Sequence, residues 1–440
     1  MRNLLLITFA AARLLPAQAA LPTEWIDPDT GHRIVRLSRE DGTQSLYFHQ
    51  NAYTPDGKKL IVTTAGGGIA TIDLASREMQ PLVAGPVSVL VAGRKTGDVY
   101  FTRRPGGRGA GPSAGESVVY AANIATGATR EVVKLPPGRS VASLNADETL
   151  LLGTYVDGPP PSGPPRNRTA DSRFGQPNYQ ALGPDGKPMT YADAKDLALH
   201  NSLMAARAGA PRVLFTLSTR TGELREVFRE HEWLGHLQFS PTDPEQIMFC
   251  HEGTWHEVDR IWTIRTDGSG LKKIHTRTMN MEIAGHEFFS ADGRTIWYDL
   301  QTPRGQDFWL AGYRIATGKR TWYHLQRNEW SVHFNVSPDG TLFAGDGGDS
   351  EMVARAPDGK WIYLFRPERV PDVAGVPNSN AEDLIDAGFF KAERLVSMAK
   401  HDYRLEPNVT FSPDMKWIVF RSNMLGPVHV FAVEIAKAVR

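Results

Sequence analysis

Six ionisable residues are crowded between two apolar segments in the stretch FSPTDPEQIMFCHEGTWHEVDRIW (residues 239–262): His251, Glu252, His256, Glu257, Asp259 and Arg260. A zinc protease of the common helical type needs two histidines four residues apart on one helix face. Here His251 and His256 are five residues apart, which separates them by roughly 140° on a helix, and Gly253 lies between them. The flanking segments IMFC and VDRIW have the composition of short strands. The helical zinc-protease motif is therefore excluded.

A second set of polar residues recurs at one position of a repeated pattern. Five residues before the Pro or Ala of each repeat's turn stand Gln50, His236, His286, His333 and Asn408, whereas one repeat has Val141 there. Because side chains alternate along a strand, equivalent positions in successive repeats point the same way. A single such histidine more often bonds a neighbouring segment, but three equivalent imidazoles favour a site. Glu406, two residues before Asn408, belongs to the same face.

The repeat consists of an aromatic or apolar residue, Ser or Thr, Pro or Ala, Asp and often Gly, followed by a β-rich run, as in FSADGRTIWYDL (289–300). Its aspartates fall at 56, 98, 147, 243, 292, 339 and 414, so most spacings are 42 to 49 residues. Asp-Gly and Thr-Gly between alternating runs are typical of hairpins. This period matches one four-stranded propeller blade, whereas two β-sandwiches would give no constant period. We predict an all-β fold in which residues 20–440 form a single seven-bladed β-propeller.

Two longer spacings predict insertions at about 157–210 and 366–401. The first contains the Pro-rich loop DGPPPSGPPRNR (157–168) and then TYADAKDLALHNSLMAARAGA (190–210), which is predicted to be a helix. The second contains AEDLIDAGFFKAERLVSMAKH (381–401), also predicted to be helical. The segment RRPGGRGAGPSAGES (103–117) is predicted to be a loop. The early strand HRIVRLS (32–38) is expected to pair with PVHVFAVEI (427–435) and so to close the ring.

The first residues have the features of a secretory signal. Arg2 is followed by a short apolar stretch, Leu4–Ala12, and Ala17-Gln18-Ala19 has the small-x-small form of a cleavage site. These features predict a signal peptide over residues 1–19 and a periplasmic or secreted protein. No later stretch approaches the length of a membrane span. The formal net charge is zero, which gives no basic field for nucleic acid, and Cys250 is the only cysteine, so no internal disulfide can form.

Four stretches resemble the oligogalacturonate lyases, a family of pectin-degrading polysaccharide lyases with a seven-bladed propeller. They are WLGHLQFSP, FCHEGTWHEVDRIW, GHEFFSADG and EPNVTFSPD, and the resemblance is most specific at residues 233–293. It implies β-elimination on short galacturonide chains, in which a histidine takes the proton from C5, an arginine assists and a manganese ion binds the uronate carboxylate. By this resemblance His236 is the catalytic base, Arg212 the arginine and His286 the first metal ligand.

The chain departs from the family at the other metal ligands. The family has Gln-x-x-His-Pro-His in the last blade, whereas this chain reads YRLEPN, from Tyr403 to Asn408. Glu406 and Asn408 thus replace the two histidines. Carboxylate and amide oxygens still suit a hard ion such as Mn²⁺, Ca²⁺ or Mg²⁺. The resemblance therefore implies a divalent-metal site of His286, Glu406 and Asn408, with Mn²⁺ as the first candidate. Four further residues are expected to bind substrate around the pocket: Gln50, His251, Arg260 and His333.

The chemistry of elimination independently requires groups of these types. A proton next to a carboxylate is weakly acidic until a cation or an arginine neutralises the carboxylate, and a histidine then suffices as the base. The sequence lacks the basic groove expected of a lyase acting along long pectin chains. This agrees with the short oligogalacturonides that the resemblance implies as the substrate. The oligomeric state is left open. The alternatives are a lyase for a different uronide and a non-catalytic periplasmic propeller, akin to the Tol-associated scaffold, that binds glycans or protein.

Overall fold

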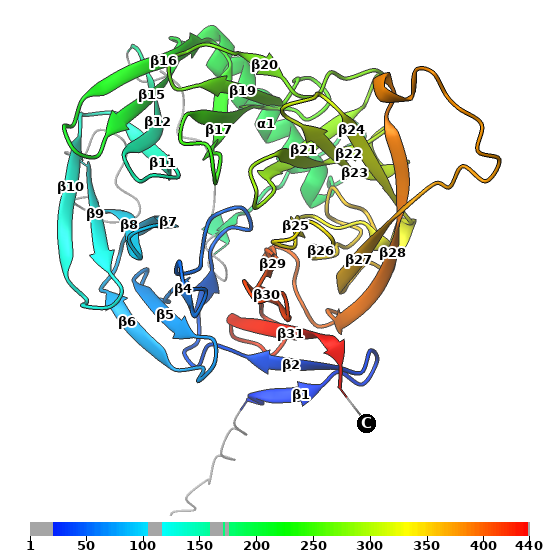
Figure 1. The fold of residues 1–440 in the computed structure, drawn as a ribbon, viewed down its shortest axis with the longest axis horizontal. Helices are drawn as coiled ribbons and strands as arrows, with labels where there is room; N and C mark the ends of the chain where they lie inside the picture. The colour runs from blue at the N-terminus through cyan, green and yellow to red at the C-terminus, as the bar shows by residue number, and fades with distance from the viewer. Residues whose placement is uncertain (1–20, 104–116, 159–169, 172–175, 439–440) are drawn as a thin grey trace, which may run out of the picture.

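Antiparallel sheets are arranged as a ring around a central axis (Figure 1). The computed structural model describes residues 21–103, 117–158, 170–171 and 176–438. In Figure 1 the strands nearest the axis include β7, β11, β17, β21, β25 and β29, which are the first strands of their repeats. The all-β, propeller-like architecture expected from the repeats is confirmed.

Four sheets have four strands each. Their strands are β3 (Gln44–Ser45), β4 (Lys59–Thr63), β5 (Ile69–Asp73) and β6 (Met79–Val83); β7 (Ser88–Ala92), β8 (Asp98–Arg103), β9 (Ser117–Asn123) and β10 (Thr129–Leu135); β11 (Ser140–Leu144), β12 (Leu150–Val156), β15 (Arg212–Ser218) and β16 (Leu224–Glu230); and β17 (Trp233–Phe239), β18 (Gln246–Glu252), β19 (Ile261–Arg265) and β20 (Lys272–Lys273). A separate two-stranded ribbon joins β13 (Ala170–Asp171) to β14 (Gln176–Pro177).

The largest sheet has eight strands and consists of two antiparallel meanders. They are β21 (Ile283–Phe289), β22 (Thr295–Gln301), β23 (Phe308–Arg314) and β24 (Arg320–Leu325), then β25 (Phe334–Val336), β26 (Phe343–Gly345), β27 (Trp361–Arg369) and β28 (Asp386–Ser397). The meanders meet where β24 pairs in parallel with β28, from Thr321↔Asp386 to His324↔Phe389. Each meander has the strand number of one repeat.

The ring is closed by strands from both ends of the chain. The last sheet contains β1 (Glu24–Ile26), β2 (His32–Arg36), β31 (His429–Lys437), β30 (Trp417–Ser422) and β29 (Thr410–Phe411). The predicted pairing of residues 32–38 with 427–435 is confirmed by the register Ile34↔Val433, Val35↔Ala432 and Arg36↔Phe431. Ile34, Phe431 and Val433 are completely buried, so closure also contributes to the core.

The aspartates of the repeat stabilise turns. Asp292 Oδ1 accepts a hydrogen bond from Ser290 Oγ at 2.6 Å and another from the Arg294 amide at 3.0 Å. Asp339 and Asp414 accept the same pair of bonds from the residues two before and two after them. A short acidic side chain that bonds the backbone two residues on fixes a chain reversal. These carboxylates therefore explain the sequence pattern as architecture and are not part of a catalytic site.

The first predicted insertion contains the expected helix, α1 (Tyr191–Ala208). It begins at Thr190, whose hydroxyl accepts a hydrogen bond from the Asp193 amide at 3.2 Å, the usual N-cap contact. The signal peptide predicted over 1–19 lies outside the described residues, as do residues 104–116 and 159–168 of the two predicted loops. Within the described part of the chain, no helix is long and apolar enough to cross a membrane.

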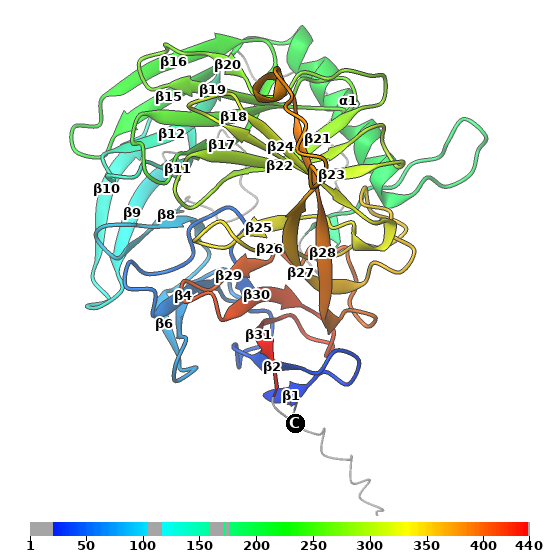
Figure 2. The same ribbon diagram turned by 45° about the vertical axis from the view of Figure 1, so that its right-hand side comes forward.

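The prediction of a helix over residues 381–401 is wrong. After a short 3₁₀ turn (Ala381–Asp383) this segment forms the twelve-residue strand β28, which stands beside β27 as a long hairpin (Figure 2). Phe390, Leu395 and Val396 are buried there. Pairing with β27 on one side and β24 on the other satisfies the backbone of β28, and this outweighs the helix propensity of its Ala, Glu, Lys and Leu residues. Residues 366–369 and 386–397 of the insertion predicted at 366–401 are therefore part of the sheet itself.

Candidate functional site

Bulges in the inner strands aim the repeated polar residues. The pairing of β17 with β18 shifts between Gly235 and Gln238, and that of β21 with β22 shifts between Gly285 and Phe288. His236 and His286 lie inside these shifts, each with a φ of 46°. A bulge re-aims a side chain, and a left-handed backbone at a non-glycine residue persists only where its surroundings hold it. Asn408, just before β29, has the same backbone character with a φ of 56°.

His236 lies between two acidic residues. Its Nε2 is 3.3 Å from Glu252 Oε2, and its Nδ1 is 3.6 Å from Glu287 Oε1. Arg260 binds both acids, with its Nε 2.9 Å from Glu287 Oε2 and its Nη1 3.2 Å from Glu252 Oε1. Burial opposes ionisation of both carboxyls, but Arg260 and His236 hold their pKa values below the usual range. The imidazole is therefore oriented by two ionised carboxylates.

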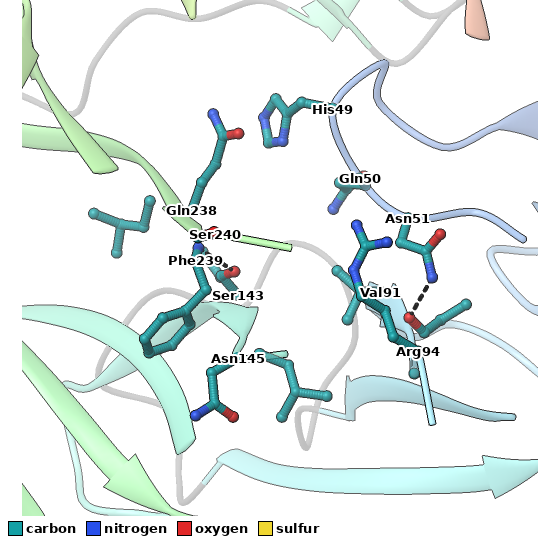
Figure 3. Close-up of a pocket in the computed structure, with 15 residues that line it drawn as sticks. His49, Gln50, Asn51, Val91, Arg94, Ser143, Asn145, Gln238, Phe239 and Ser240 are labelled. Atoms are coloured by element: carbon teal, nitrogen blue, oxygen red, sulfur yellow. Dashed lines mark hydrogen bonds between the residues drawn. The ribbon is translucent and has the colours of Figure 1, made fainter. Parts of the chain in front are cut away.

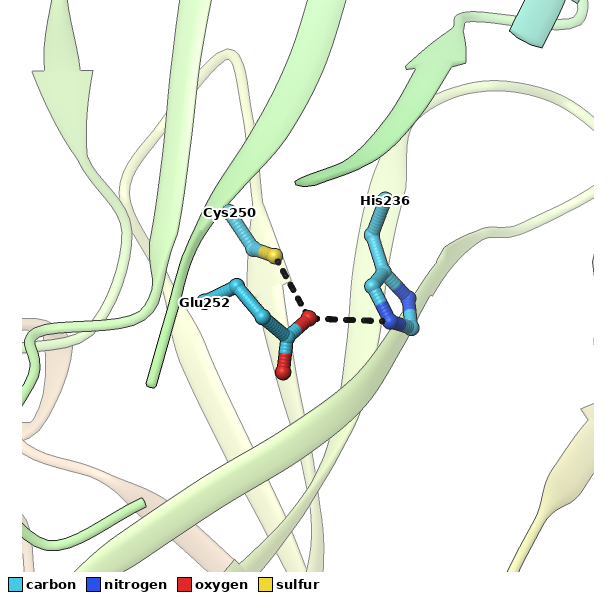
Figure 4. A group of neighbouring side chains, drawn as sticks. All are labelled: His236, Cys250 and Glu252. Carbon is cyan, nitrogen blue, oxygen red and sulfur yellow. Dashed lines mark hydrogen bonds and ion pairs between the residues drawn. The ribbon is translucent and has the colours of Figure 1, made fainter. Parts of the chain in front are cut away.

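Cys250 adjoins this group, which we call the base cluster (His236, Glu252, Glu287 and Arg260). Figure 4 shows Glu252 between the thiol, 3.7 Å away, and His236. Ligand atoms of His236, Cys250 and Glu252 lie within 4.8 Å of one another. However, burial raises the pKa of the Cys250 thiol well above its usual value, so the thiol stays protonated, and Arg260 already neutralises the carboxylates. These two facts make the base cluster a poor resident metal site.

His286 and His333 form a second group with Glu406. His286 Nδ1 donates to Asp299 Oδ1 at 3.0 Å, and His333 Nδ1 donates to Asp346 Oδ2 at 2.8 Å. The centroids of the two imidazole rings are 4.7 Å apart. His333 Nε2 is buried without a hydrogen-bond partner, 3.7 Å from Glu406 Oε2. Metal-binding histidines commonly donate their other ring N–H to a carboxylate, which leaves Nε2 as the ligand atom.

Glu406 is ionised in these surroundings. Burial raises its pKa, but the charges of Lys195, His333 and His286 outweigh burial and bring the pKa to about 2. Two anchored imidazoles and a carboxylate are donors that suit a divalent ion such as Mn²⁺. We call His286, His333 and Glu406 the metal pocket. The Nε2 atom of His333 is buried without a hydrogen-bond partner, and this observation favours an ion in the metal pocket.

Asn408, predicted as a metal ligand, has both ends of its side chain engaged. Its Oδ1 accepts a hydrogen bond from the Phe48 amide at 3.2 Å, and its Nδ2 donates to the Glu406 carbonyl at 2.9 Å. The Asn408 amide also donates to Asp346 Oδ2 at 3.1 Å. The residue therefore fastens the segment around Glu406 to the rest of the channel.

The segment Tyr47–His49 connects the two groups. The Tyr47 ring is 6.3 Å from that of His236 and 5.3 Å from that of His333, while His49 is 6.3 Å from His236. Burial and the nearby His236 lower the pKa of His49 to about 3, so it is neutral near pH 7. The sequence interpretation missed these residues because it selected Gln50 by its place in the repeat. The available signal was the cluster of rings in YFH.

The structure places four other predicted site residues as follows. Gln50 bonds the backbone, donating to the Leu90 carbonyl at 2.9 Å and accepting from the Tyr47 amide at 3.0 Å. His251 belongs to β18 and so points away from its neighbour Glu252; its Nε2 is 2.6 Å from Glu230 Oε1. Arg212 begins β15, opposite Glu230 in the register. Arg260 is 3% exposed and is held by the two glutamates that flank His236.

A small cavity adjoins His49 (Figure 3). Its volume is about 50 Å³, and its lining includes Gln238, Ser143 and Arg94, with no acidic residue among the lining side chains. Sites for small organic ligands are typically several hundred Å³. This cavity is therefore too small to accept a sugar ring.

Comparisons with known proteins agree with these features. The oligogalacturonate lyase family model matches residues 206–439, just over half of the chain. The chain is 22% identical to the oligogalacturonate lyase of Dickeya dadantii (strain 3937) over 94% of this chain and 96% of that protein. It is 25% identical to the oligogalacturonide lyase of Pectobacterium atrosepticum over 50% of this chain and 54% of that one.

Solved structures share the fold. An oligogalacturonate lyase in complex with manganese superimposes with a TM-score of 0.68 and 20% identity, covering 94% of this chain and 96% of that one. The oligogalacturonate lyase from Vibrio parahaemolyticus gives a TM-score of 0.66 and 18% identity, with coverages of 95% and 97%. The family model, which includes the strands that carry His236, His286 and His333, decides the classification: this chain belongs to the oligogalacturonate lyase family.

Proposed function

We propose that this protein cleaves short oligogalacturonides by β-elimination in the central channel of a seven-bladed propeller. In this proposal, residues 20–440 form one domain, and each meander of the eight-stranded sheet is a separate blade. The observation that carries the functional proposal is the pairing of an oriented histidine, His236, with a nearby group of metal-binding character. Membership of the lyase family and three imidazoles at equivalent positions of the repeat favour catalysis over a non-catalytic scaffold.

His236 acts as the base in this proposal. It removes the proton from C5 of the uronide; the electron pair of that C–H bond forms the C4=C5 double bond, and the C4–O bond breaks. The departing oxygen takes up a proton, so the products are one unsaturated and one saturated fragment, and no water is consumed. Glu252 and Glu287 orient the imidazole and stabilise the imidazolium formed by proton transfer, because both carboxylates lie within 3.6 Å of its nitrogens.

The metal pocket holds a divalent ion, with Mn²⁺ as the first candidate, because one structural relative is in complex with manganese. When bound, the ion withdraws charge from the uronate carboxylate and so acidifies the C5 proton. His286, His333 and Glu406 hold it, while Asp299 and Asp346 fix the two rings. In this proposal Asn408 positions Glu406, in place of the metal-ligand role expected from the sequence. Ca²⁺ and Mg²⁺ are the competing ions, given the carboxylate donor.

Two arginines have separate roles. Arg260 is a positioning residue, because both of its ion pairs are internal and its side chain is only 3% exposed. Arg212 neutralises the substrate's carboxylate, as the family resemblance implies. His251 lies on the face of β18 opposite to Glu252 and stabilises the base cluster from that side.

Export to the periplasm or beyond is part of the same proposal and is tested by fractionation of cells that express the full chain.

The test is digestion of di- and trigalacturonate, with added Mn²⁺ or with a chelator. Ultraviolet absorbance follows the unsaturated uronate, and mass spectrometry distinguishes elimination from hydrolysis, whose products are heavier by one water. Elimination products that appear only with the ion support the proposal. The absence of any product under both conditions would contradict it for galacturonides.

A lyase for a different uronide is the second candidate, and one observation favours it. The metal pocket carries Glu406 where the family pattern has histidine, which changes the charge beside the substrate. The same assay on oligomers of guluronate, mannuronate and glucuronate separates the two candidates. Preferential elimination of one of these oligomers would replace galacturonate as the substrate.

A further inference from the structure

The helix α1 brings a cation to the metal pocket. Lys195 Nζ lies 3.8 Å from Glu406 Oε1 and 5.9 Å from the centre of the Trp255 ring. Its side chain is 27% exposed, compared with 3% for Arg260. No hydrogen bond joins Lys195 Nζ to any other residue in the described part of the chain. The ammonium group is therefore near the site but not fully engaged.

The position of Lys195 is built into the fold. Arg304 Nη2 lies 2.9 Å from Asp193 Oδ1 and its Nη1 lies 2.6 Å from Asp196 Oδ2, so the helix is bound on both sides of Lys195. The Ala192 amide also donates to the Glu351 carbonyl at 3.0 Å. Because Asp196 is nine-tenths buried and paired, the first turns of α1 are fixed against the ring. Lys195 is thus presented to the channel by a rigid element.

A cation in the metal pocket would compete with Lys195 for Glu406. The two positive groups would share one carboxylate, and their mutual repulsion would free the ammonium group for another anion. The anion that the proposed reaction brings to this place is the uronate carboxylate. A lysine with three donors and no fixed partner suits that contact.

We propose that Lys195 binds the carboxylate of the uronide beside the metal pocket, so that α1 is a substrate-recognition element. This inference rests on the proposed function for the identity of the sugar. Lys195 is a binding residue here, and it holds the carboxylate while the base cluster acts on C5. Its contact with Glu406 is the resting position of the side chain before metal and substrate arrive.

The test compares Lys195→Met with wild type, Lys195→Arg and the control Lys187→Met. Lys187 is 81% exposed at a turn before α1, and among the described residues its ammonium group pairs only with Asp185, at 3.5 Å. Isothermal titration measures two constants without turnover: the Kd for Mn²⁺, and the Kd for monomeric galacturonate in the presence of Mn²⁺. Galactose, which has the same ring but no carboxylate, is titrated alongside.

Lys195→Met is expected to bind Mn²⁺ about tenfold more tightly, because a like charge is removed. It is expected to bind galacturonate about tenfold or more weakly, because a charge-assisted contact is lost, while galactose binding stays unchanged. In turnover with trigalacturonate, KM rises. Lys195→Arg retains most of the galacturonate affinity, and Lys187→Met matches wild type.

Unchanged Kd values for both Mn²⁺ and galacturonate in a folded Lys195→Met protein would overturn the inference, even if wild type is an active lyase. Conversely, a wild type that binds galacturonate through Lys195 but eliminates nothing would leave the inference standing and refute the proposed function. If Lys195→Met fails to fold, as judged by circular dichroism, Lys195→Gln is measured in its place. The two proposals are therefore separable.

Discussion

At the scale of single residues, the site consists of two groups with different functions, and the segment Tyr47–His49 connects them. His236, its two glutamates and Arg260 form the base cluster, whereas His286, His333 and Glu406 form the metal pocket. Tyr47 contacts the rings of both His236 and His333. Substitutions in the base cluster are expected to leave Mn²⁺ affinity unchanged, and substitutions in the metal pocket are expected to leave the function of His236 as the base unchanged.

His333→Gln is expected to lower the affinity for Mn²⁺ about tenfold to a hundredfold, because it removes an anchored ligand with a free ring nitrogen. Calorimetric titration of Mn²⁺ measures this effect. His251→Gln serves as the matched control, since His251 is also a strand histidine paired with a carboxylate but lies on the far face of β18. Equal affinities in wild type and His333→Gln would remove His333 from the metal pocket.

A buried histidine outside the two groups predicts a pH dependence of stability. His401 bonds Ser422 Oγ and the Leu405 carbonyl, and burial lowers its pKa to about 4. The unfolded chain takes up a proton on this residue below about pH 6.5, whereas the folded chain does not until about pH 4. His401 therefore contributes stability above pH 6.5 that is lost as the pH falls toward 4, by at most about 3 kcal/mol.

Chemical denaturation at pH 7, 5.5 and 4 checks this effect. Wild type is expected to lose more unfolding free energy across this interval than His401→Gln, whatever the absolute stability of the variant. Parallel pH curves for the two proteins would show that His401 does not contribute.

At the scale of elements, the bulges of β17 and β21 position the two functional groups. A Cβ at residue 285 would lie 3.2 Å from Asp299 Oδ1, and a Cβ at residue 235 would lie 3.3 Å from Glu252 Oε2. Each contact is tight, so an added methyl group displaces the carboxylate that orients the neighbouring histidine. The two glycines thus form a matched pair, one for each group.

Gly285→Ala is expected to weaken Mn²⁺ binding severalfold by disturbing the Asp299–His286 bond, with little change in kcat at saturating metal. Gly235→Ala is expected to lower kcat and leave Mn²⁺ affinity as in wild type. Steady-state kinetics and metal titration on both variants give a crossed comparison. The same effect on both properties in both variants would argue that the bulges act only through stability.

The repeat predicted the hairpins, the ring closure and α1, because these depend on local turn chemistry and on a regular period. It did not predict β28, because that strand is stabilised by pairing with β27 and with β24, and its own sequence does not reveal these contacts. For the site, equivalence between repeats identified His236, His286 and His333. It could not show that Gln50 and Asn408 use their amides on the backbone, or that Lys195 approaches Glu406 from a helix two hundred residues away.

At the scale of the whole molecule, closure of the ring holds the inner strands around one axis. The β2–β31 pairing joins the two ends of the chain, and its apolar residues are completely buried. Removing residues 21–36 would delete β1 and β2, expose one edge of β31 and leave buried surface open to water. This deletion is expected to lower Tm by many degrees.

Differential scanning fluorimetry measures the change in Tm. The control replaces residues 371–379, which are all exposed in the loop between β27 and β28, with a short Gly-Ser linker, and Tm is expected to stay within a few degrees of that of wild type. A deletion of 21–36 that melts like this control would mean that closure does not limit stability.

The most direct test of the account is to measure kcat on trigalacturonate and Mn²⁺ affinity for the same variant, His236→Gln. The account predicts that kcat falls by about 10² to 10⁴, the usual contribution of a general base, while Mn²⁺ binds as tightly as in wild type. A His236→Gln enzyme that still eliminates at the wild-type rate would contradict the assignment of His236 as the base, and with it the central claim.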